Sequence, residues 1–297
     1  MDTPMISVII TTYKRPVDIV CRAIDSALSQ TYRKFEIIVV DDSPQSAQRD
    51  SVRDALTQRY GAAILYIQNE QNMGACASRN KGFYHSKGEY IAFLDDDDQW
   101  LPEKNELMLK CFDSDDIGLV YCALLPYKNG KPVKNSRQKS YEGYVLPQLL
   151  RSNFIGGCSV PLFPREVLEI CGLFDETLPS SQDTDVYRRV AAKYKVRYLD
   201  KPLVIYFMTE DSITGNQKRQ IKGRLMMLEK YDAEYSAHPD IRKQYAGKIF
   251  VGLLATNQGT EAWSLFRKEF GESTSAIISG LPLIAKGYFK RLVLHQE

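Results

Sequence analysis

The 297-residue sequence lacks the long apolar runs and paired cysteines that mark several large protein classes. Its longest apolar runs, IFVGLLA from residue 249 and AIISGLPLIA from residue 276, fall short of the roughly 20 residues that cross a bilayer. The six cysteines form no CxxC pair, and no secretory leader precedes the first apolar run. These absences argue against a membrane-spanning, disulfide-rich or secreted protein, and we expect reduced thiols in the cytoplasm.

A strong net charge is also missing, because the formal charge is only +2. The charge is unevenly distributed: residues 1–214 hold 26 Lys and Arg against 29 Asp and Glu, whereas residues 215–297 hold 13 against 8. This division argues against a nucleic-acid partner for the chain as a whole and leaves room for a basic tail that meets an anionic surface. With 44% hydrophobic residues, the chain can bury a sizeable core.

Strand-like apolar runs alternate with helical patterns in the first third of the sequence. MISVIITTY (5–13) and FEIIVVDDS (35–43) flank a helical stretch at 18–30 and so predict a βαβ unit. Further runs at 62–69 and 89–95 each follow another helical stretch, the second of which starts near Ala77. Continuous apolar strands separated by helices indicate an α/β fold with a mostly parallel sheet covered on both faces.

Polar and acidic side chains follow three of these strands. Thr11, Thr12 and Tyr13 end the first run, Asp41 and Asp42 end the second, and four aspartates at 95–98 follow the fourth. Ligands of such sheets bind at the carboxyl ends of the strands, so we expect these groups to share one edge. A glycine-rich phosphate loop is absent, because TTYKRP follows the first strand and GxxxxGK[ST] occurs nowhere.

The four consecutive aspartates raise the cost of ionising one another. A divalent cation bound by carboxylate oxygens would offset this repulsion and could bridge the aspartates to a diphosphate. The alternative is a solvated acidic turn, which is the common fate of a charge run. The position after an apolar strand, on the ligand edge of the sheet, favours the cation.

Five blocks of sequence resemble family 2 glycosyltransferases, which have the glycosyltransferase-A fold and are found in bacterial surface-polysaccharide assembly. The resemblance covers about residues 5–207. The blocks are SVIITTYKRP (7–16), SQTYRKFEIIVVDDS (29–43), NMGACASRNKG (72–82), GEYIAFLDDDDQWLPEK (88–104) and GLFDETLPSSQDTDVYRRV (172–190).

The resemblance implies a Rossmann-like αβα sandwich over residues 1–214, followed by a helical extension over 215–297. It implies an inverting transfer of a hexosyl or N-acetylhexosaminyl group from a nucleotide-diphosphate sugar, with UDP as the expected nucleotide, to a saccharide or lipid-linked acceptor. Mn²⁺ or Mg²⁺ is the implied cofactor, with Asp97 as the metal ligand. The implied donor-binding residues are Thr11, Tyr13, Arg15, Asp41, Asp42, Arg79, Asp95 and Asp96, among which Thr11, Tyr13 and Asp42 stand where the family contacts the base and ribose.

Asp183 matches the general base of the family, on a segment that reads as a helix start. A capping aspartate on a surface helix is the alternative. Gln182 stands where the family usually has glutamate, and this departure keeps a second function open, namely a non-catalytic glycan-binding or scaffold protein derived from a transferase. Phe207 and Thr209 replace an arginine and a histidine of many relatives.

Acceptor binding is expected at residues near the acidic run and the base. Trp100 would stack on a sugar ring or fill the core. Gly156 and Gly157 would let the backbone approach a sugar closely or would form a tight turn. The acceptor candidates are Trp100, Gly156, Gly157, Gln182 and Asp185.

The sequence from about residue 216 onward has helical spacing and ends in the basic, apolar segment AKGYFKRLVLH (285–295). It predicts helices that pack on the catalytic domain or on a second subunit, or that make peripheral contact with the inner face of the membrane.

Overall fold

The structure is a computed structural model that describes residues 3–128, 130–133, 139–208 and 216–271. Its contacts divide the chain into two compact units. The sheet unit comprises Met1–Leu146, Phe154–Glu176 and Asp183–Thr209, and the helical unit comprises Pro147–Asn153, Thr177–Gln182 and Glu210–Glu297. The predicted boundary between residues 214 and 215 lies outside the described residues and stays a prediction.

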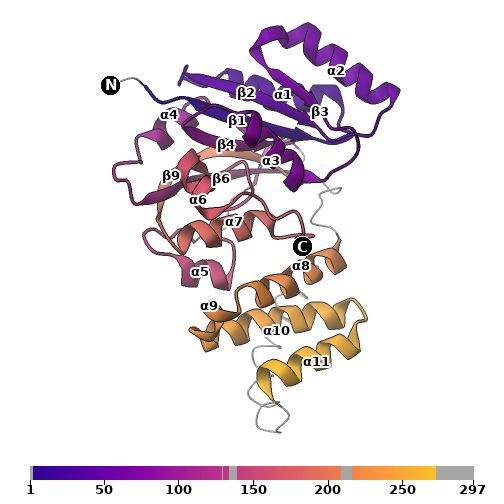
Figure 1. Cartoon of the computed structure of the whole chain (residues 1–297), viewed down its shortest axis with the longest axis vertical. Helices are drawn as coiled ribbons and strands as arrows, with labels where there is room; N and C mark the ends of the chain where they lie inside the picture. The colour runs from indigo at the N-terminus through magenta and orange to yellow at the C-terminus, as the bar shows by residue number, and fades with distance from the viewer. Residues whose placement is uncertain (1–2, 129, 134–138, 209–215, 272–297) are drawn as a thin grey trace. The chain divides into compact units, whose positions relative to one another are not determined.

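Strands and helices alternate along the sheet unit (Figure 1). The strands are β1 (Ile6–Thr12), β2 (Phe35–Asp41), β3 (Leu65–Gln68), β4 (Tyr90–Asp95), β5 (Gln99–Trp100), β6 (Ile117–Lys128), β7 (Lys131–Pro132), β8 (Leu162–Pro164) and β9 (Lys195–Phe207). The helices are α1 (Val17–Leu28), α2 (Ala47–Tyr60), the 3₁₀ helix η1 (Gly61–Ala63), α3 (Ala75–His85), α4 (Lys104–Leu109), α6 (Arg165–Cys171) and α7 (Gln182–Ala191). Helix α5 (Leu146–Arg151), apart from its first residue, belongs to the helical unit.

One mixed sheet has the strand order β3-β2-β1-β4-β8-β6-β9-β5, with β7 paired to β6. Strands β3, β2, β1 and β4 are mutually parallel, as their continuous apolar runs predicted. The short strand β8 is antiparallel to both β4 and β6, while β6 and β9 are parallel to each other. The expected α/β sandwich is thus confirmed, and β8 joins its first half to a second half that the sequence patterns did not predict.

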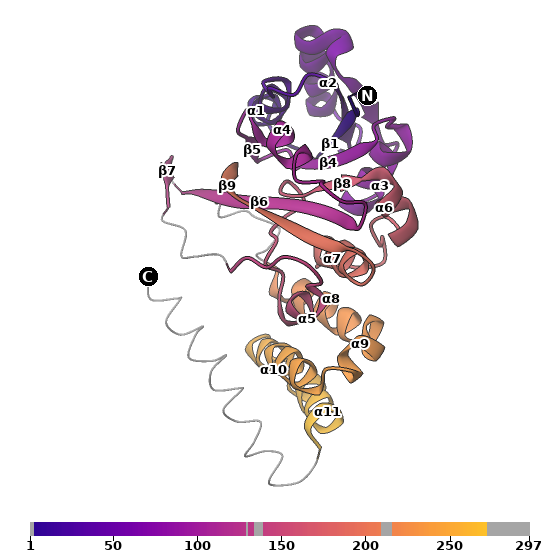
Figure 2. The same ribbon diagram turned by 90° about the vertical axis from the view of Figure 1, so that its left-hand side faces the viewer.

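Apolar side chains on both faces explain why the sheet is covered twice. Val8, Ile9 and Ile10 are all fully buried, because successive side chains of a strand point to opposite faces. Figure 2 shows α1 and α4 on one face of the sheet and α3 and α6 on the other. The core therefore lies between helices and sheet, and the polar groups gather at the strand ends.

The helical unit is built around α8 (Gln217–Lys230), α9 (Asp232–Ser236), α10 (Pro239–Ala255) and α11 (Gly259–Phe270). The rings of Tyr235 and Tyr245 stack at 5.2 Å, and Phe250 packs on Phe266 at 5.4 Å. Among the described residues, no helix is long and apolar enough to cross a membrane. The basic segment 285–295 lies outside them.

Candidate functional site

The ends of three parallel strands form the candidate site. In the sheet, Thr12 lies beside Asp41 of β2, and Thr11 lies beside Asp95 of β4. The edge that the sequence predicted is thereby formed from three separate segments of the chain. The neighbouring strands hold these groups rigidly, as a preorganised site requires.

The acidic turn at 95–98 alternates between buried and partly exposed carboxylates. The side chain of Asp96 is 6% exposed and Asp98 is 5% exposed, whereas the side chains of Asp95 and Asp97 are 31% and 29% exposed. Two carboxylates therefore support the turn from within, and two are open to a ligand.

Asp98 is held by Ser159, whose hydroxyl donates to Asp98 Oδ2 at 2.5 Å. The same hydroxyl oxygen accepts the backbone N–H of Asp95 at 3.0 Å, and the backbone N–H of Asp98 donates to the carbonyl of Asp95 at 3.1 Å. Burial, followed by the charge of Asp95, raises the pKa of Asp98 well above its ordinary value. These contacts fix the shape of the turn.

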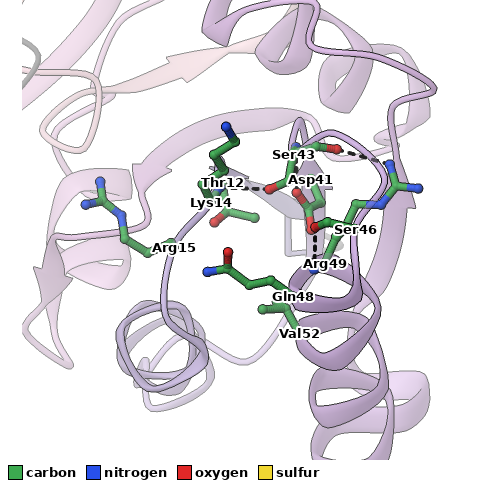
Figure 3. A pocket seen from close by; sticks show the side chains of 9 residues that line it. All are labelled: Thr12, Lys14, Arg15, Asp41, Ser43, Ser46, Gln48, Arg49 and Val52. Carbon is green, nitrogen blue, oxygen red and sulfur yellow. Dashed lines mark hydrogen bonds between the residues drawn. The ribbon is translucent and has the colours of Figure 1, made fainter.

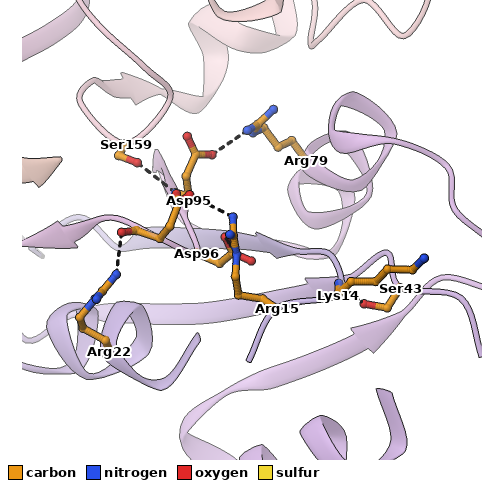
Figure 4. Close-up of polar contacts among 9 residues, drawn as sticks. Lys14, Arg15, Arg22, Ser43, Arg79, Asp95, Asp96 and Ser159 are labelled. Carbon is orange, nitrogen blue, oxygen red and sulfur yellow. Dashed lines mark hydrogen bonds and ion pairs between the residues drawn. The ribbon is translucent and has the colours of Figure 1, made fainter. Parts of the chain in front are cut away.

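Two arginines neutralise the other carboxylates of the turn (Figure 4). Arg15 places Nε 3.0 Å from Asp96 Oδ1 and Nη2 3.0 Å from Asp97 Oδ2. Arg79, on α3, places Nη2 2.6 Å from Asp95 Oδ1. Charge-assisted hydrogen bonds of this kind are the strong ones, and they explain how a run of like charges is tolerated at a strand end.

A third arginine supports the backbone of the turn. Arg22, on α1, donates from Nη2 to the carbonyl oxygen of Asp97 at 2.8 Å, and its guanidinium lies 3.9 Å from the centre of the Phe207 ring. The ring of Phe207 thus serves as the platform for an arginine from another element. Thr209 lies outside the described residues.

The exposed carboxylates of the turn fit a hard divalent cation. Burial raises the pKa of Asp97, the charges of Asp95 and Asp96 raise it further, and Arg15 opposes them. Carboxylate oxygens at a partly exposed edge are the ligands that Mg²⁺ and Mn²⁺ prefer. Over the described ranges no group of three or more His, Cys, Asp and Glu residues converges, so a cation here needs further oxygens from water or from a bound phosphate.

Asp183 lies in the first turn of α7 and is partly buried. Its Oδ1 accepts the backbone N–H of Thr184 at 2.6 Å and the hydroxyl of the same residue at 3.2 Å. Burial raises the pKa of Asp183, Arg79 lowers it, and Asp95 raises it. The candidate base therefore lies within electrostatic reach of Arg79 and Asp95, the two charged groups of the acidic turn and α3 that act on its pKa.

A narrow pocket opens beside Asp41 (Figure 3). Asp41 Oδ1 accepts the backbone N–H of Ser43 at 2.8 Å, and Oδ2 accepts the hydroxyl of Tyr66 at 2.6 Å. The backbone N–H of Lys14 donates to the Ser43 hydroxyl at 2.7 Å, which closes the loop after β1 onto the loop after β2. The lining residues are Thr12, Lys14, Arg15, Asp41, Ser43, Ser46, Gln48, Arg49 and Val52.

Both carboxylate oxygens of Asp42 accept hydrogen bonds from the protein chain itself. Oδ1 accepts the backbone N–H of Met73 at 2.7 Å and the side-chain amide of Asn69 at 2.8 Å, and Oδ2 accepts the backbone N–H of Gly74 at 2.8 Å. Asp42 thus anchors the loop from which α3 begins, and α3 carries Arg79. A contact of Asp42 with the base or ribose stays a prediction.

Trp100 does not offer a face to a sugar. Its side chain is fully buried at 1% exposure, and its indole N–H donates to the carbonyl of Ser159 at 2.8 Å. This burial favours the interpretation that the indole fills the core beneath the acidic turn over stacking on an acceptor sugar. Ser159 fixes both Trp100 and the turn above it.

Asp185 is likewise an internal group. It is fully buried and forms an ion pair with Arg189 at 2.9 Å. Arg189 also donates to the carbonyls of Cys171, Gly172 and Leu173. Asp185 therefore holds an arginine that ties α7 to the end of α6, and its burial favours this structural position over acceptor binding.

The other acceptor candidates differ in their surroundings. Gly156 has φ +112° and a Cβ there would meet Leu124 at 3.1 Å, which favours the tight turn. A Cβ on Gly157 would lie 3.9 Å from Asp95 Oδ2, so this glycine does border the acidic turn. Gln182, in the helical unit, donates to the carbonyl of Leu178 at 2.8 Å.

The remaining donor candidates lie on the edge of the sheet. Thr11 is partly buried beside Asp95, and Tyr13 is 44% exposed after the end of β1. The sequence interpretation placed Thr12 at this edge without assigning it a role, and it missed Ser43 and Arg49; all three line the pocket. TTY and DDS in the first two blocks carried a signal for Thr12 and Ser43, because both directly adjoin predicted residues.

Comparisons with known sequences point to one enzyme family. The family model described as Glycosyl transferase family 2 matches residues 7–169. An uncharacterized glycosyltransferase of Rickettsia typhi is 32% identical over 279 residues, which cover 91% of this chain and 81% of the relative. WcaA of Escherichia coli, whose name connects it with colanic acid biosynthesis, is 33% identical over 207 residues, which cover 65% of this chain and 68% of the relative.

Solved structures resemble the chain over most of its length. S. aureus TarS 1–349 in complex with UDP-GlcNAc matches with a TM-score of 0.63 at 19% identity, over 84% of this chain and 72% of that chain. The mannosyltransferase PcManGT from Pyrobaculum calidifontis, in complex with GDP-Man and Mn²⁺, matches with a TM-score of 0.60 at 17% identity, over 97% and 81%. At these identities the likeness establishes the shared fold.

Proposed function

The chain belongs to glycosyl transferase family 2 and has the glycosyltransferase-A fold, and we propose that it transfers a hexosyl or N-acetylhexosaminyl group from a UDP-sugar, with inversion, in polysaccharide biosynthesis. A single observation supports this proposal above the others. Asp95 and Asp97 present partly exposed carboxylates at the edge of the sheet where Asp41 lines a pocket. At the same edge, Arg79 interacts electrostatically with Asp183.

On the donor side, Asp41 accepts a ring N–H of the base, with its oxygens held in place by the hydrogen bonds from Ser43 and Tyr66. Arg79 and Arg15 provide positive charge for the diphosphate. Mn²⁺ or Mg²⁺, bound by Asp97 with support from Asp95, would stabilise the negative charge that develops on the leaving diphosphate.

On the acceptor side, Asp183 removes the proton from the attacking hydroxyl. Its position in the first turn of α7 is fixed by the hydrogen bonds from Thr184. Gly157 leaves space beside Asp95 for the acceptor sugar, while Asp185 and Trp100 hold the surrounding elements. A saccharide or a lipid-linked saccharide is the proposed acceptor, in keeping with the name of WcaA.

Release of UDP tests this function directly. Purified protein is incubated with UDP-, GDP-, CDP- and dTDP-sugars in Mn²⁺, Mg²⁺ or chelator, and the free nucleoside diphosphate is measured. We expect UDP from UDP-sugars in the presence of a divalent cation and a large loss with Asp97→Ala. A protein that binds glycans but releases no nucleoside diphosphate from any donor is instead the non-catalytic binder that Gln182 left open.

We further propose that the protein acts in the cytoplasm, with peripheral contact at the inner face of the membrane. The excess of Lys and Arg over Asp and Glu in residues 215–297 supports this contact. Flotation of the full chain with vesicles tests it: binding to vesicles rich in anionic lipid, lost at 0.5 M salt or with zwitterionic lipid, supports the contact. Equal recovery from both kinds of vesicle contradicts it.

A further inference from the structure

The three arginines around the acidic turn are held in different ways. Arg79 is 11% exposed in its side chain, and its guanidinium also lies 5.3 Å from the centre of the Phe174 ring. Arg22 binds a backbone carbonyl and stacks on Phe207. Contacts other than the carboxylates therefore keep both of these arginines in place.

Arg15 lacks such additional support among the described residues. It lies in the loop between β1 and α1, its side chain is 32% exposed, and its side-chain hydrogen bonds go to Asp96 and Asp97 alone. One guanidinium thus bridges the buried carboxylate that supports the turn and the exposed carboxylate proposed to bind the cation. It is the arginine that can leave with the fewest other contacts broken.

A cation that binds Asp97 competes with Arg15 for the same carboxylate. Nη2 of Arg15 occupies Oδ2 of Asp97 at 3.0 Å, and two positive charges cannot share this oxygen without strong repulsion. A cation on Asp97 therefore weakens the hold of this carboxylate on the guanidinium, whether it binds Oδ2 or the neighbouring Oδ1. A diphosphate next to the turn would offer the displaced guanidinium a planar, bidentate acceptor in place of the carboxylates.

We propose that Arg15 is a positioning residue that takes the place of the cation on Asp97 until the donor arrives, so that the divalent cation binds firmly only together with a diphosphate. This inference rests on the proposed function. Linkage requires the coupling to be reciprocal, because whatever the diphosphate does to cation affinity the cation does to diphosphate affinity. The free protein then resists metal loading, and the loaded site forms in one concerted step.

Binding of Mn²⁺ alone tests the inference without any turnover. The natural protein and Arg15→Gln are titrated with Mn²⁺ in the absence of nucleotide, with free Mn²⁺ followed by electron paramagnetic resonance. We expect Arg15→Gln to bind Mn²⁺ at least about 10-fold more tightly, since removal of one adjacent positive charge at this distance strengthens cation binding by at least this factor. In chelator, calorimetry is expected to show weaker binding of UDP to the same variant.

The inference predicts tighter binding of Mn²⁺ but weaker binding of UDP by Arg15→Gln. A loosened fold would instead weaken the binding of both ligands. Arg15→Lys retains the charge but forms one contact in place of two, so its Mn²⁺ affinity should lie between those of Arg15→Gln and the natural protein. Arg53→Gln, which removes an exposed arginine from α2, is the control and should leave both affinities unchanged.

Unchanged or weaker binding of Mn²⁺ by both Arg15 variants, in a protein that still binds Mn²⁺ with UDP, overturns the inference and leaves the proposed function intact. Absence of Mn²⁺ binding by the natural protein even with UDP overturns both, since the cation would then have no part in the site. The two failures are therefore distinguishable in one set of titrations.

Discussion

At the scale of single residues, the acidic turn distributes four like charges by alternation. Asp96 and Asp98 point inward and are held by Arg15 and Ser159, while Asp95 and Asp97 remain partly exposed. Burial raises the pKa of each of the two inward carboxylates, so their hydrogen bonds are needed to keep them in place. This alternation leaves the carboxylates of Asp95 and Asp97 accessible to a ligand, while Asp96 and Asp98 support the turn.

Asp183→Asn tests the base at this scale. The amide keeps the size of the side chain and its contact with Thr184 but cannot remove a proton, so we expect turnover to fall by at least about 100-fold. Donor affinity should change little, because the acceptor side is affected. Direct transfer kinetics and calorimetry of UDP binding measure the two quantities. Asp50→Asn, which also changes an aspartate in the first turn of a helix, should leave turnover and UDP affinity unchanged.

The pH dependence follows from the raised pKa of Asp183. A general base acts only when it is ionised, so kcat/KM should fall as the pH decreases through the pKa of Asp183. Because burial raises this pKa, the fall should begin at a higher pH than for an exposed aspartate near 3.9. Saturating Mn²⁺ separates this effect from protonation of Asp97. A residual activity of Asp183→Asn that keeps the same acid limb would contradict the assignment.

The sequence predicted which residues gather at the edge but not the direction of every side chain. Asp41 and Asp42 are neighbours in one DDS motif, yet of the two only Asp41 lines the pocket, while Asp42 holds the loop before α3. The sequence likewise did not show that Trp100 and Asp185 are buried. Tertiary packing brings Trp100 to Ser159 and Asp185 to Arg189, and the spacing of residues in a motif does not encode these contacts.

At the scale of elements, periodicity predicted the four parallel strands and the helices between them, because their apolar runs are continuous. The second half of the sheet was not predicted. Strand β8 has only three residues, and β9 carries the polar stretch Asp200 to Pro202 in its middle, so neither shows a clear period. Their pairing with β4 and β6 depends on long-range contacts that local pattern does not encode.

The loop after β1 contains a local conflict between residue and backbone. Lys14 has φ +50°, in the left-handed region that asparagine adopts more readily than lysine. We expect Lys14→Asn to raise the free energy of unfolding by about 0.5–1 kcal/mol, because the strain is reduced while the backbone bond to Ser43 is kept. Urea denaturation measures the change. Lys14→Ala is the matched control, and an equal gain from alanine would rule out backbone strain as the cause.

At the scale of the whole molecule, a buried lysine makes stability depend on pH. Lys104 is fully buried on α4, its Nζ has no hydrogen-bond partner in the part of the chain that the structure describes, and its ammonium lies 4.1 Å from the centre of the Trp100 ring. Burial lowers the pKa of Lys104 to about 8 from the ordinary value of 10.5. Below pH 8 the folded protein therefore contains a buried charge with only an aromatic ring to stabilise it.

The sign of the effect follows from proton binding. Between pH 8 and 10.5 the unfolded chain still holds the proton that folded Lys104 has released, so the free energy of unfolding rises with pH. Relative to Lys104→Met, the natural protein should gain about 1–3 kcal/mol across this window, since one pKa unit corresponds to about 1.4 kcal/mol. Urea denaturation of both proteins at pH 7, 8, 9 and 10 measures the difference. Lys110→Met, which removes an exposed lysine of the same segment, should show no such slope, and a pH-independent difference for Lys104→Met would mean that Lys104 stays charged in the core.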